Sequence, residues 1–391
     1  MNLDKRITRR QRDTAGIVLD GEVLSPAAHV ADPVGRGPTF EGLLDYLDPV
    51  LDGDLPPNAY IWGPAGAGKS AVVTALFAHL QPRPSELGSI VHTATRARSG
   101  REQPQSFVYV DARTATTDFG LYHAVLDGIV DESVPTQGVR TDALLAQLRD
   151  ALAPSSRQAV VAVDHVGEFE TYSLSGLAET LAPLDDDLAW VGIGRDHPTD
   201  LDGTPPVQRF EVPVYDTQTL ADIVTSRAML GLDARALTHR QCRAIAAWAD
   251  GSAHDALAAL FVAADRASER GRSTIDDGDI ARARESIPRP CVPLAQVLTL
   301  APNRQRVLYA LLDVEAGERS SVEETAAAIA ADVDLSAGTV KRYLYEFADD
   351  GIVDRVRTDG STSGRPPSRV EPRFPIRVFR RLHERSEPDR G

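Results

Sequence analysis

The segment from Gly63 to Ser70 constrains the fold of this 391-residue chain more than any other part of it. It reads Gly-Pro-Ala-Gly-Ala-Gly-Lys-Ser, the G-x-x-x-x-G-K-[ST] spacing of a phosphate-binding loop. Closely spaced glycines let the backbone turn so that several N–H groups point inward, toward phosphate oxygens. Lys69 is one of only three lysines among 42 basic residues, so its place in this turn indicates a specific need for an ammonium group.

The residues on either side of the loop predict the setting that such a loop needs. Residues 59–62 predict a short buried strand that enters it, and residues 71–80 predict an apolar helix that leaves it. The helix N-terminus would then face the anion. We therefore expect this segment to bind ATP or ADP, with Lys69 at the β- and γ-phosphates and Ser70 on Mg²⁺. The expected nucleotide contacts are Gly63, Pro64, Ala65, Gly66, Ala67, Gly68, Lys69, Ser70 and Ala71.

Length and composition limit the classes of protein to consider. A chain of this length with 42% apolar residues predicts two or three domains with cores of their own. Its two cysteines, Cys242 and Cys291, are too few for a disulfide framework or a metal cluster. The sequence contains no run of about 18 apolar residues, which is the length that a membrane-spanning helix needs. We therefore expect a cytoplasmic protein with no membrane partner.

The formal net charge of −15 accompanies strong lysine depletion. This composition resembles the cytosolic proteins of salt-loving archaea. In molar salt the Debye length is about 3 Å, so net charge says little about partners and local basic patches matter more. The alternative is an acidic protein that avoids nucleic acid.

Five apolar segments predict the strands of a parallel sheet, because helical patterns lie between them. The segments are residues 59–62, 107–111, 159–164, 190–194 and 210–214. Ligands of such sheets bind at the carboxyl ends of the strands, where Lys69, Asp164 and Arg195 fall in the sequence. Asp164 ends the clearest strand, and we expect it to contact Mg²⁺ together with Ser70.

The residue after Asp164 bears on whether a bound nucleotide is hydrolysed. Hydrolysing relatives of such proteins place an acidic residue there to orient the attacking water, whereas this chain has His165. An imidazole has an ordinary pKa of about 6.5 and differs in length from an acidic side chain, which makes it a poor substitute for the carboxylate. Glu168 is the other candidate for a general base. The sequence therefore supports nucleotide binding better than turnover.

The remaining segments predict further regions. Residues 1–30 read as a polar extension that either touches DNA or is a solvated arm, and residues 81–105 read as a long flexible insertion. From residue 215 to 288 the pattern is purely helical, and residues 288–290 read as a linker. The arginines of the extension are Arg6, Arg9, Arg10 and Arg12.

Residues 321–351 predict a helix-turn-helix. Helices are expected over residues 322–331 and 337–349, with Ser336 as the N-cap of the second. Apolar residues recur along the second helix and should face the core; they are Val340, Leu344 and Phe347. The positions left for double-stranded DNA are Thr339, Lys341, Arg342 and Tyr345.

A hairpin follows this second helix and predicts a wing. It begins at residue 352, turns over residues 358–364 and returns to Val370, with Arg357, Arg365 and Arg369 as expected DNA contacts. From Arg355 to the end the chain has ten arginines against five acidic residues, a local basic excess in an acidic protein. Such a wing suits phosphate and minor-groove contact, although winged helices also serve as protein-interaction modules.

Together these motifs resemble the archaeal origin-recognition and cell-division-control replication-initiator family of AAA+ ATPases. The resemblance covers residues 30–380, and the stretches that carry it are residues 34–36 with 55–58, 107–111 with 135–138, 212–216 and 251–257. It implies an α/β fold in which a P-loop parallel sheet with a helical lid is followed by an α+β winged-helix domain. It also implies that Tyr215 and His254 contact the nucleotide.

On this resemblance the chain divides into five parts. They are an N-terminal extension (1–30), a nucleotide-binding base (31–214), a helical lid (215–290), a winged helix (293–383) and a tail (384–391).

Three positions depart from the family pattern. His165 stands where the family has an acidic residue, Arg195 follows a strand that normally ends in asparagine, and His254 stands where the family has an arginine. Arg209 is only a weak candidate for an arginine finger. We therefore expect a diverged paralogue that binds ATP or ADP and hydrolyses it slowly or not at all.

Several functions fit this sequence. The first is a nucleoid-associated initiator that recognises origin DNA and helps load the replicative helicase. The second is a nucleotide-responsive DNA-binding regulator, for transcription or for maintenance of a plasmid. The third is a non-catalytic partner of an active initiator paralogue. Fold alone does not separate them.

Overall fold

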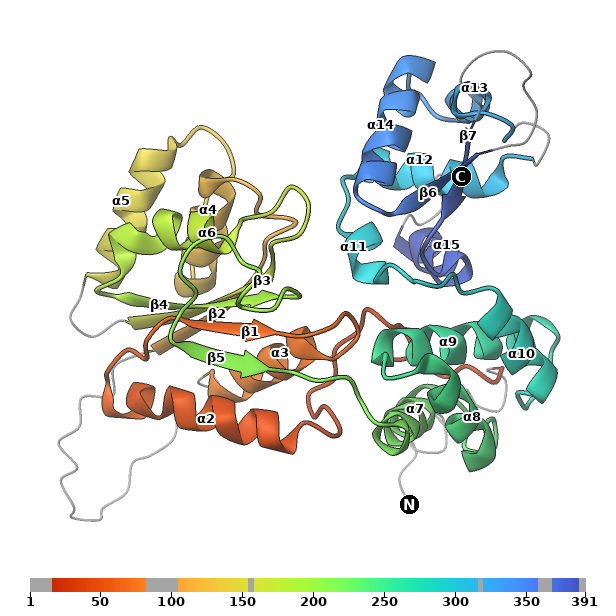
Figure 1. Cartoon of the computed structure of the whole chain (residues 1–391), viewed down its shortest axis with the longest axis horizontal. Coiled ribbons are helices and arrows are strands. Elements are labelled where there is room, and N and C mark those ends of the chain that lie inside the picture. The colour runs from red at the N-terminus through yellow and green to blue at the C-terminus, as the bar shows by residue number, and fades with distance from the viewer. Residues whose placement is uncertain (1–15, 82–104, 154–157, 316–318, 358–367, 387–391) are drawn as a thin grey trace. The chain divides into compact units, whose positions relative to one another are not determined.

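The computed structural model describes residues 16–81, 105–153, 158–315, 319–357 and 368–386 (Figure 1). The chain forms two compact units. One is His29–Val214, and the other combines the N-terminal residues up to Ala28 with Tyr215–Gly391. None of the helices within the described ranges is long and apolar enough to cross a membrane.

The first unit is built on a five-stranded sheet. Its order is β2-β3-β4-β1-β5, and every neighbouring pair is parallel. The strands are β1 (Ala59–Trp62), β2 (Gln105–Asp111), β3 (Gln158–Val166), β4 (Leu188–Gly194) and β5 (Gln208–Glu211). Strands β3 and β4 are apolar nearly throughout, because a central parallel strand is covered on both faces. The five expected strands are confirmed, with shifts of a few residues at their ends.

Helices cover both faces of this sheet (Figure 1). One face packs against α2 (Gly37–Asp52) and α3 (Lys69–Leu80), through residues such as Leu43 and Val72. The other face packs against α4 (Asp118–Ile129), α5 (Thr141–Leu152) and α6 (Leu174–Leu181), through residues such as Leu121 and Leu148. The sheet therefore separates two apolar cores, and the residues that directly follow the parallel strands lie along its carboxyl edge.

From Tyr215 onward, the second unit contains first a group of four helices. They are α7 (Thr217–Gly231), α8 (His239–Ala249), α9 (Ala253–Glu269) and α10 (Asp277–Glu285). Helix α9 is buried along most of its length, which its run of alanine, leucine and phenylalanine side chains explains.

The N-terminal segment from Gly16 to Ala28 packs against these helices, whereas the sequence predicted a polar extension. Ile17 and Leu24 are buried at 3% and 1% exposure. Arg227 of α7 donates hydrogen bonds to the carbonyl oxygens of Val23 and Ala28. Two buried apolar side chains and one buried guanidinium thus hold a segment that is polar on average. The arginine cluster of residues 6–12 and the insertion at 82–104 lie outside the described residues.

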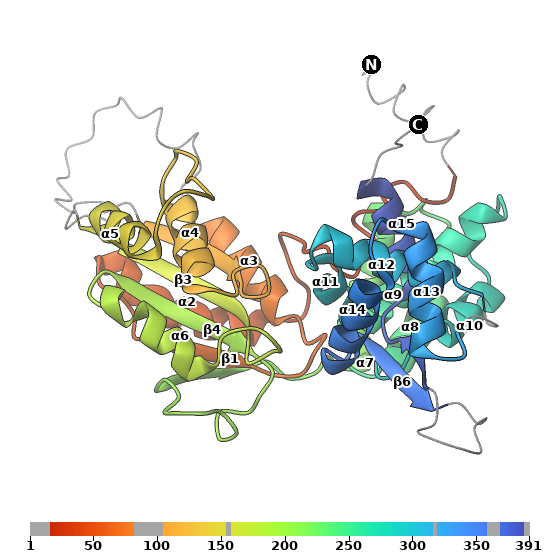
Figure 2. The same ribbon diagram turned by 90° about the horizontal axis from the view of Figure 1, so that it is seen from above.

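The C-terminal part of the second unit has the expected helix-turn-helix and hairpin. Its helices are α11 (Leu294–Leu298), α12 (Pro302–Asp313), α13 (Val322–Asp332), α14 (Ala337–Asp349) and α15 (Ile376–Ser386). Strands β6 (Val353–Arg357) and β7 (Ser368–Pro372) pair antiparallel beside α14 (Figure 2). Ser336 caps α14 by accepting a hydrogen bond from the Thr339 N–H. The residues expected to face the core, Val340, Leu344 and Phe347, are fully buried.

Candidate functional site

The predicted phosphate loop joins β1 to α3 with its glycines in left-handed backbone conformations. Gly66 has φ +75° and Gly68 has φ +81°, and α3 begins at Lys69, inside the motif. Gly63 has φ +148°, and a Cβ there would lie 2.2 Å from the Val212 carbonyl oxygen. Glycine is therefore required at Gly63 both by its conformation and by the close approach of the chain after β5.

A buried arginine fastens the loop to the same neighbouring segment. Arg36 is 5% exposed and donates to the carbonyl oxygens of Ala67 and Pro213, both at 2.7 Å. This arginine precedes α2 and joins the loop at Ala67 to the segment that follows β5 at Pro213.

The Lys69 side chain lies within the loop. It is 8% exposed, and its Nζ donates to the carbonyl oxygens of Gly63 at 2.6 Å and Pro64 at 2.9 Å. Burial lowers the pKa of Lys69 to about 8, and the nearby Arg195 charge acts in the same direction while Asp164 and Glu168 oppose it. The ammonium is thus held by weak acceptors, for which phosphate oxygens are stronger replacements.

Asp164 lies at the carboxyl end of β3 and is 2% exposed. Its Oδ1 accepts the His165 N–H at 2.7 Å, and its Oδ2 accepts the Tyr109 hydroxyl at 2.6 Å. The Tyr109 hydroxyl also accepts a hydrogen bond from the Ser70 hydroxyl, so one phenol contacts both Ser70 and Asp164. Burial, and next the Asp164 charge, raise the pKa of Tyr109 above its ordinary value.

Ser70 and Asp164 therefore fit a magnesium ion by the chemistry of their donors. Both supply hard oxygen ligands, and both lie within reach of the Tyr109 hydroxyl, as expected for groups that share one small ion. Sequence reasoning missed Tyr109, although its place two residues before the end of β2 was a usable signal.

His165, the residue after Asp164, forms a bulge near the end of β3. It has φ +66°, and the register between β3 and β4 shifts there. This bulge turns the ring toward Glu168, whose Oε1 lies 3.1 Å from His165 Nδ1. The same Oε1 lies 2.8 Å from a terminal nitrogen of Arg195, which follows β4. Both predicted catalytic candidates are therefore in one cluster with the arginine that replaces the expected asparagine.

The second oxygen of Glu168 has no protein partner among the described residues, although it is buried. Burial alone would raise the pKa of Glu168. The hydrogen bond from His165 and the charges of His165, Arg195 and Arg113 outweigh burial and hold this pKa below its ordinary value. Glu168 is thus an ionised carboxylate stabilised by neighbouring cations, which weakens it as a proton acceptor.

Arg113, which sequence reasoning missed, is a further cation at this edge. It follows β2, its side chain is 10% exposed, and it donates two hydrogen bonds to the Asp111 carboxylate at 2.9 and 2.6 Å. Strand register brings it here, since Asp111 pairs with Asp164 across β2 and β3.

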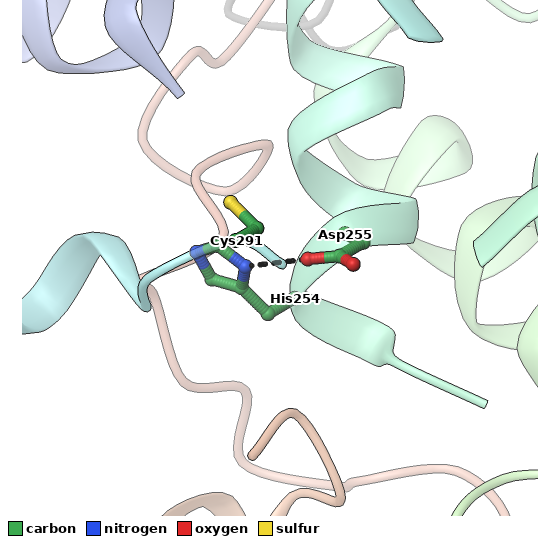
Figure 3. A group of neighbouring side chains, drawn as sticks. All are labelled: His254, Asp255 and Cys291. Carbon is green, nitrogen blue, oxygen red and sulfur yellow. Dashed lines mark hydrogen bonds and ion pairs between the residues drawn. The ribbon is translucent and has the colours of Figure 1, made fainter. Parts of the chain in front are cut away.

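Tyr215 and His254, the other predicted nucleotide contacts, lie in the second unit. The Tyr215 N–H donates to the Gly251 carbonyl oxygen at 3.2 Å. His254 Nδ1 lies 3.0 Å from an Asp255 oxygen, and Nε2 accepts the Leu294 N–H at 2.9 Å (Figure 3). Both ring nitrogens of His254 are therefore engaged within that unit, and the nucleotide role of the two residues stays a prediction.

The predicted DNA contacts lie on α14 and on the hairpin, and most have internal partners. Lys341 pairs with Glu323, Arg342 lies 3.7 Å from Glu346, and Arg369 lies 2.5 Å from Glu371. The aromatic ring of Tyr345 lies beneath the Arg355 guanidinium, 4.7 Å from its carbon. Thr339 helps cap α14, and Arg357 is exposed at the end of β6. Arg365 lies outside the described residues.

Comparison with known proteins gives consistent matches. A family profile described as AAA ATPase domain matches residues 32–191. The ORC1-type DNA replication protein of Pyrococcus abyssi is 25% identical over 330 residues, which cover 80% of this chain and 75% of the relative. The ORC1-type DNA replication protein 8 of Halobacterium salinarum is 25% identical over 293 residues, 71% of each chain.

Two solved structures share the fold over nearly the whole chain. The Aeropyrum pernix ORC1 protein in complex with DNA has a TM-score of 0.61 at 21% identity, covering 95% of this chain and 97% of that one. The Aeropyrum pernix ORC2 protein, in ADPNP-ADP complexes, has a TM-score of 0.54 at 18% identity, covering 95% of this chain and 98% of that one.

Proposed function

Because the chain belongs to the archaeal origin-recognition and cell-division-control family of AAA+ replication initiators, we propose that it binds ATP and double-stranded DNA as an initiator with weak or absent hydrolysis. Its fold is the α/β AAA+ fold with a C-terminal winged-helix domain. The observation that carries the proposal is the buried Lys69 ammonium at the start of α3, which donates to the carbonyl oxygens of Gly63 and Pro64 in the loop.

Nucleotide binding follows from what the loop offers an anion. The backbone N–H groups at the start of α3 have no intrahelical acceptors, and the helix dipole favours negative charge there. Phosphate oxygens would replace the Gly63 and Pro64 carbonyls as acceptors for Lys69. Ser70 and Asp164 would hold Mg²⁺, which supplies charge neutralisation for the phosphates when bound.

Weak hydrolysis follows from the state of Glu168. A general base must reach the attacking water and accept its proton. Glu168 is paired with Arg195 and hydrogen-bonded to His165. These contacts restrict the movement of its carboxylate toward a water molecule, and they lower its pKa and so its basicity. We propose that this cluster slows turnover and that the nucleotide acts mainly as a bound switch.

DNA binding rests on α14 and the hairpin. Residues 293–383 carry thirteen basic and thirteen acidic residues, so this region is neutral in a chain whose net charge is −15. Neutrality removes the long-range repulsion that an acidic domain would exert on phosphate. Contact with DNA would exchange the glutamate partners of Lys341, Arg342 and Arg369 for phosphate, which keeps the net electrostatic gain small.

Single-turnover hydrolysis of radiolabelled ATP in molar KCl tests the nucleotide part. Wild type should retain nucleotide through purification, and Lys69→Ala should retain none. Asp164→Asn should bind nucleotide without magnesium dependence. Nucleotide retained equally by Lys69→Ala would refute the proposal, while fast turnover by wild type would refute the weak hydrolysis alone.

Salt-dependent DNA binding tests the second part. Replacement of Arg357 and Arg369 by alanine should weaken binding to all duplexes and reduce the dependence of log affinity on log salt by about two, one for each lost phosphate contact. Arg306→Ala is the matched control, because Arg306 is an exposed arginine of α12 outside the proposed surface. An equal loss in the control would argue against a DNA-reading face on α14 and the hairpin.

The regulator and paralogue-partner functions remain the alternatives, and the constrained Glu168 favours them over an initiator that cycles through hydrolysis. Binding to the replicative minichromosome-maintenance helicase separates these functions. Helicase binding in the presence of DNA would support the loading role, and DNA binding without helicase binding would support the regulator.

A further inference from the structure

Helix α9 contacts the winged-helix region near both of its ends. At its start, His254 accepts the N–H of Leu294, the first residue of α11, at 2.9 Å. The other ring nitrogen of His254 lies against Asp255, so the ring is fixed between the lid helix and the start of the C-terminal region (Figure 3). Accepting a backbone N–H at Nε2 leaves the proton on Nδ1, where it is donated to the Asp255 carboxylate.

His254 also lies beside two other side chains that could bind a metal ion, Asp255 and Cys291. His254, Asp255 and Cys291 place their ligand atoms within 4.8 Å of one another. A metal on Nδ1 would force the proton to Nε2, which would then face the Leu294 N–H donor. A metal on Nε2 would have to displace that N–H. The hydrogen bonding of the ring therefore favours a structural clamp over a metal centre.

At the other end of α9, two carboxylates face two arginines of α15. Asp265 accepts from Arg381 Nε at 2.9 Å and from Arg377, and Glu269 pairs with both guanidinium groups. The side chains lie one turn apart on each helix, so the four charges form a closed two-by-two cluster. Its Asp265 side chain is only 17% exposed, which limits screening by salt.

The protonation behaviour of this cluster agrees with its geometry. The hydrogen bond from Arg377 and the charges of Arg377 and Arg381 lower the pKa of Glu269 below its ordinary value, against a smaller opposing effect of burial. Burial alone would lower the pKa values of Arg377 and Arg381, but their carboxylate partners raise both above the ordinary value. These shifts favour the ionised form of Glu269 and the charged forms of Arg377 and Arg381, as the ion pairs require.

The two contacts act together because they are far apart along one helix. From His254 to Asp265 is 11 residues, roughly 16 Å at 1.5 Å per residue. With a single contact, the winged helix could rotate about that point relative to α9. Two contacts separated by this length resist such a rotation. The Val292 N–H also donates to the Arg373 carbonyl oxygen at 2.7 Å, which fastens the linker beside the hairpin.

We infer that His254, Arg377 and Arg381 are positioning residues that fix the winged helix to the lid as one rigid body, so that lid movement carries the DNA-reading surface with it. This regulatory coupling rests on the proposed function, since it gives nucleotide binding a mechanical route to DNA. It also gives His254 a role in place of the arginine that the family pattern has at that position. A lid residue that could contact nucleotide is thereby used to hold the winged helix.

Spin-label distance measurements on the full chain test the coupling. Labels at Ala247→Cys in α8 and Ala327→Cys in α13 report the lid-to-winged-helix distance, because both positions are exposed helix surface. Cys242 is buried, and burial raises the pKa of the Cys291 thiol to about 12, so labelling goes to the introduced thiols. We expect one narrow distance distribution that is the same without nucleotide, with ADP and with a slowly hydrolysed ATP analogue.

The variant Arg377→Gln/Arg381→Gln should broaden that distribution. Arg380→Gln is the matched control on the same helix, because Arg380 pairs with Asp313 of α12, inside the winged-helix region. Asp265→Asn removes a charge of the same cluster on α9, in the lid, and should broaden the distribution in the same way. A broad or nucleotide-dependent distribution in wild type, or a double variant as narrow as wild type, would overturn the inference.

A second label pair keeps this result separate from the proposed function. Labels at Ala146→Cys in α5 and at Ala327→Cys report movement between the nucleotide-binding base and the winged helix. No nucleotide response in this pair would count against the nucleotide switch. A constant lid-to-winged-helix distance would still support the rigid body.

Discussion

Replacement of Lys69 by methionine should stabilise the nucleotide-free protein near neutral pH while abolishing nucleotide binding. Burial lowers the pKa of Lys69 from its ordinary 10.5 to about 8. At about 1.4 kcal/mol per pKa unit, holding this ammonium in the folded loop costs about 3 kcal/mol at pH 7. Methionine keeps a long apolar side chain and removes the charge. The buried Lys69 charge thus lowers the stability of the nucleotide-free protein, and a bound anion would offset that cost.

The pH dependence separates this charge effect from other consequences of the substitution. Between pH 8 and 10.5 the unfolded chain holds the Lys69 proton while the folded chain has released it. The free energy of unfolding of wild type should therefore rise through this window relative to Lys69→Met, and the full difference should apply below pH 8. Lost hydrogen bonds to Gly63 and Pro64 lower the stability of the variant equally at every pH, so they shift its curve without changing the slope.

Thermal unfolding followed by tryptophan fluorescence measures this difference. Trp62 and Trp190 lie in β1 and β4 of the same sheet and report its unfolding. For a unit of this size, about 3 kcal/mol corresponds to roughly 6–12 °C in melting temperature. The gap between the two proteins should close by that amount from pH 7 to pH 10.5.

The control is Lys341→Met, in which the replaced lysine is exposed and paired with Glu323. That pairing raises the pKa of Lys341, so no divergence from wild type should develop between pH 8 and 10. Parallel curves for wild type and Lys69→Met across the same window would show that the Lys69 charge is not desolvated and would refute the reasoning.

Three further predictions concern the same sheet edge. Gly63→Ala should lower the stability of the first unit by at least about 2 kcal/mol in urea unfolding, because its Cβ would meet the Val212 carbonyl oxygen at 2.2 Å and its φ is +148°. Arg195→Gln should speed single-turnover ATP hydrolysis by releasing Glu168, and an unchanged or slower rate would show that Arg195 does not restrain that carboxylate. Asp164→Asn should leave nucleotide affinity in EDTA unchanged in equilibrium titrations and remove its increase with Mg²⁺, and a retained increase would place the metal elsewhere.

Local patterns in the sequence were sufficient for several elements. The spacing of the phosphate loop predicted β1 and the helix after it, although α3 begins at Lys69 instead of Ala71. The bounds of α14 match the expected range of 337–349, because this helix has strong apolar periodicity. Helix α6 was missed, although Ser173 is its N-cap and Leu174, Leu177 and Leu181 form its buried face.

Other features depend on partners that are distant in sequence. Residues 16–28 read as a polar arm, since only the fold shows that Arg227 and α7 cover them. The internal ion pairs of the predicted DNA contacts were equally invisible, because Lys341 and Glu323 lie on different helices. A composition count therefore predicted a basic surface, and the structure shows basic residues that already have acidic neighbours.

The sequence by itself determined that a phosphate loop lies between a strand and a helix, that Asp164 ends a buried strand, and that a winged helix follows. Each of these depends on residues close together in the chain, so spacing and periodicity are enough. Only the tertiary structure decided that Tyr109 joins Ser70 to Asp164, that Arg195 restrains Glu168, and that His254 holds Leu294. Those contacts depend on strand register and helix packing, which are set by how apolar surfaces from distant segments bury one another.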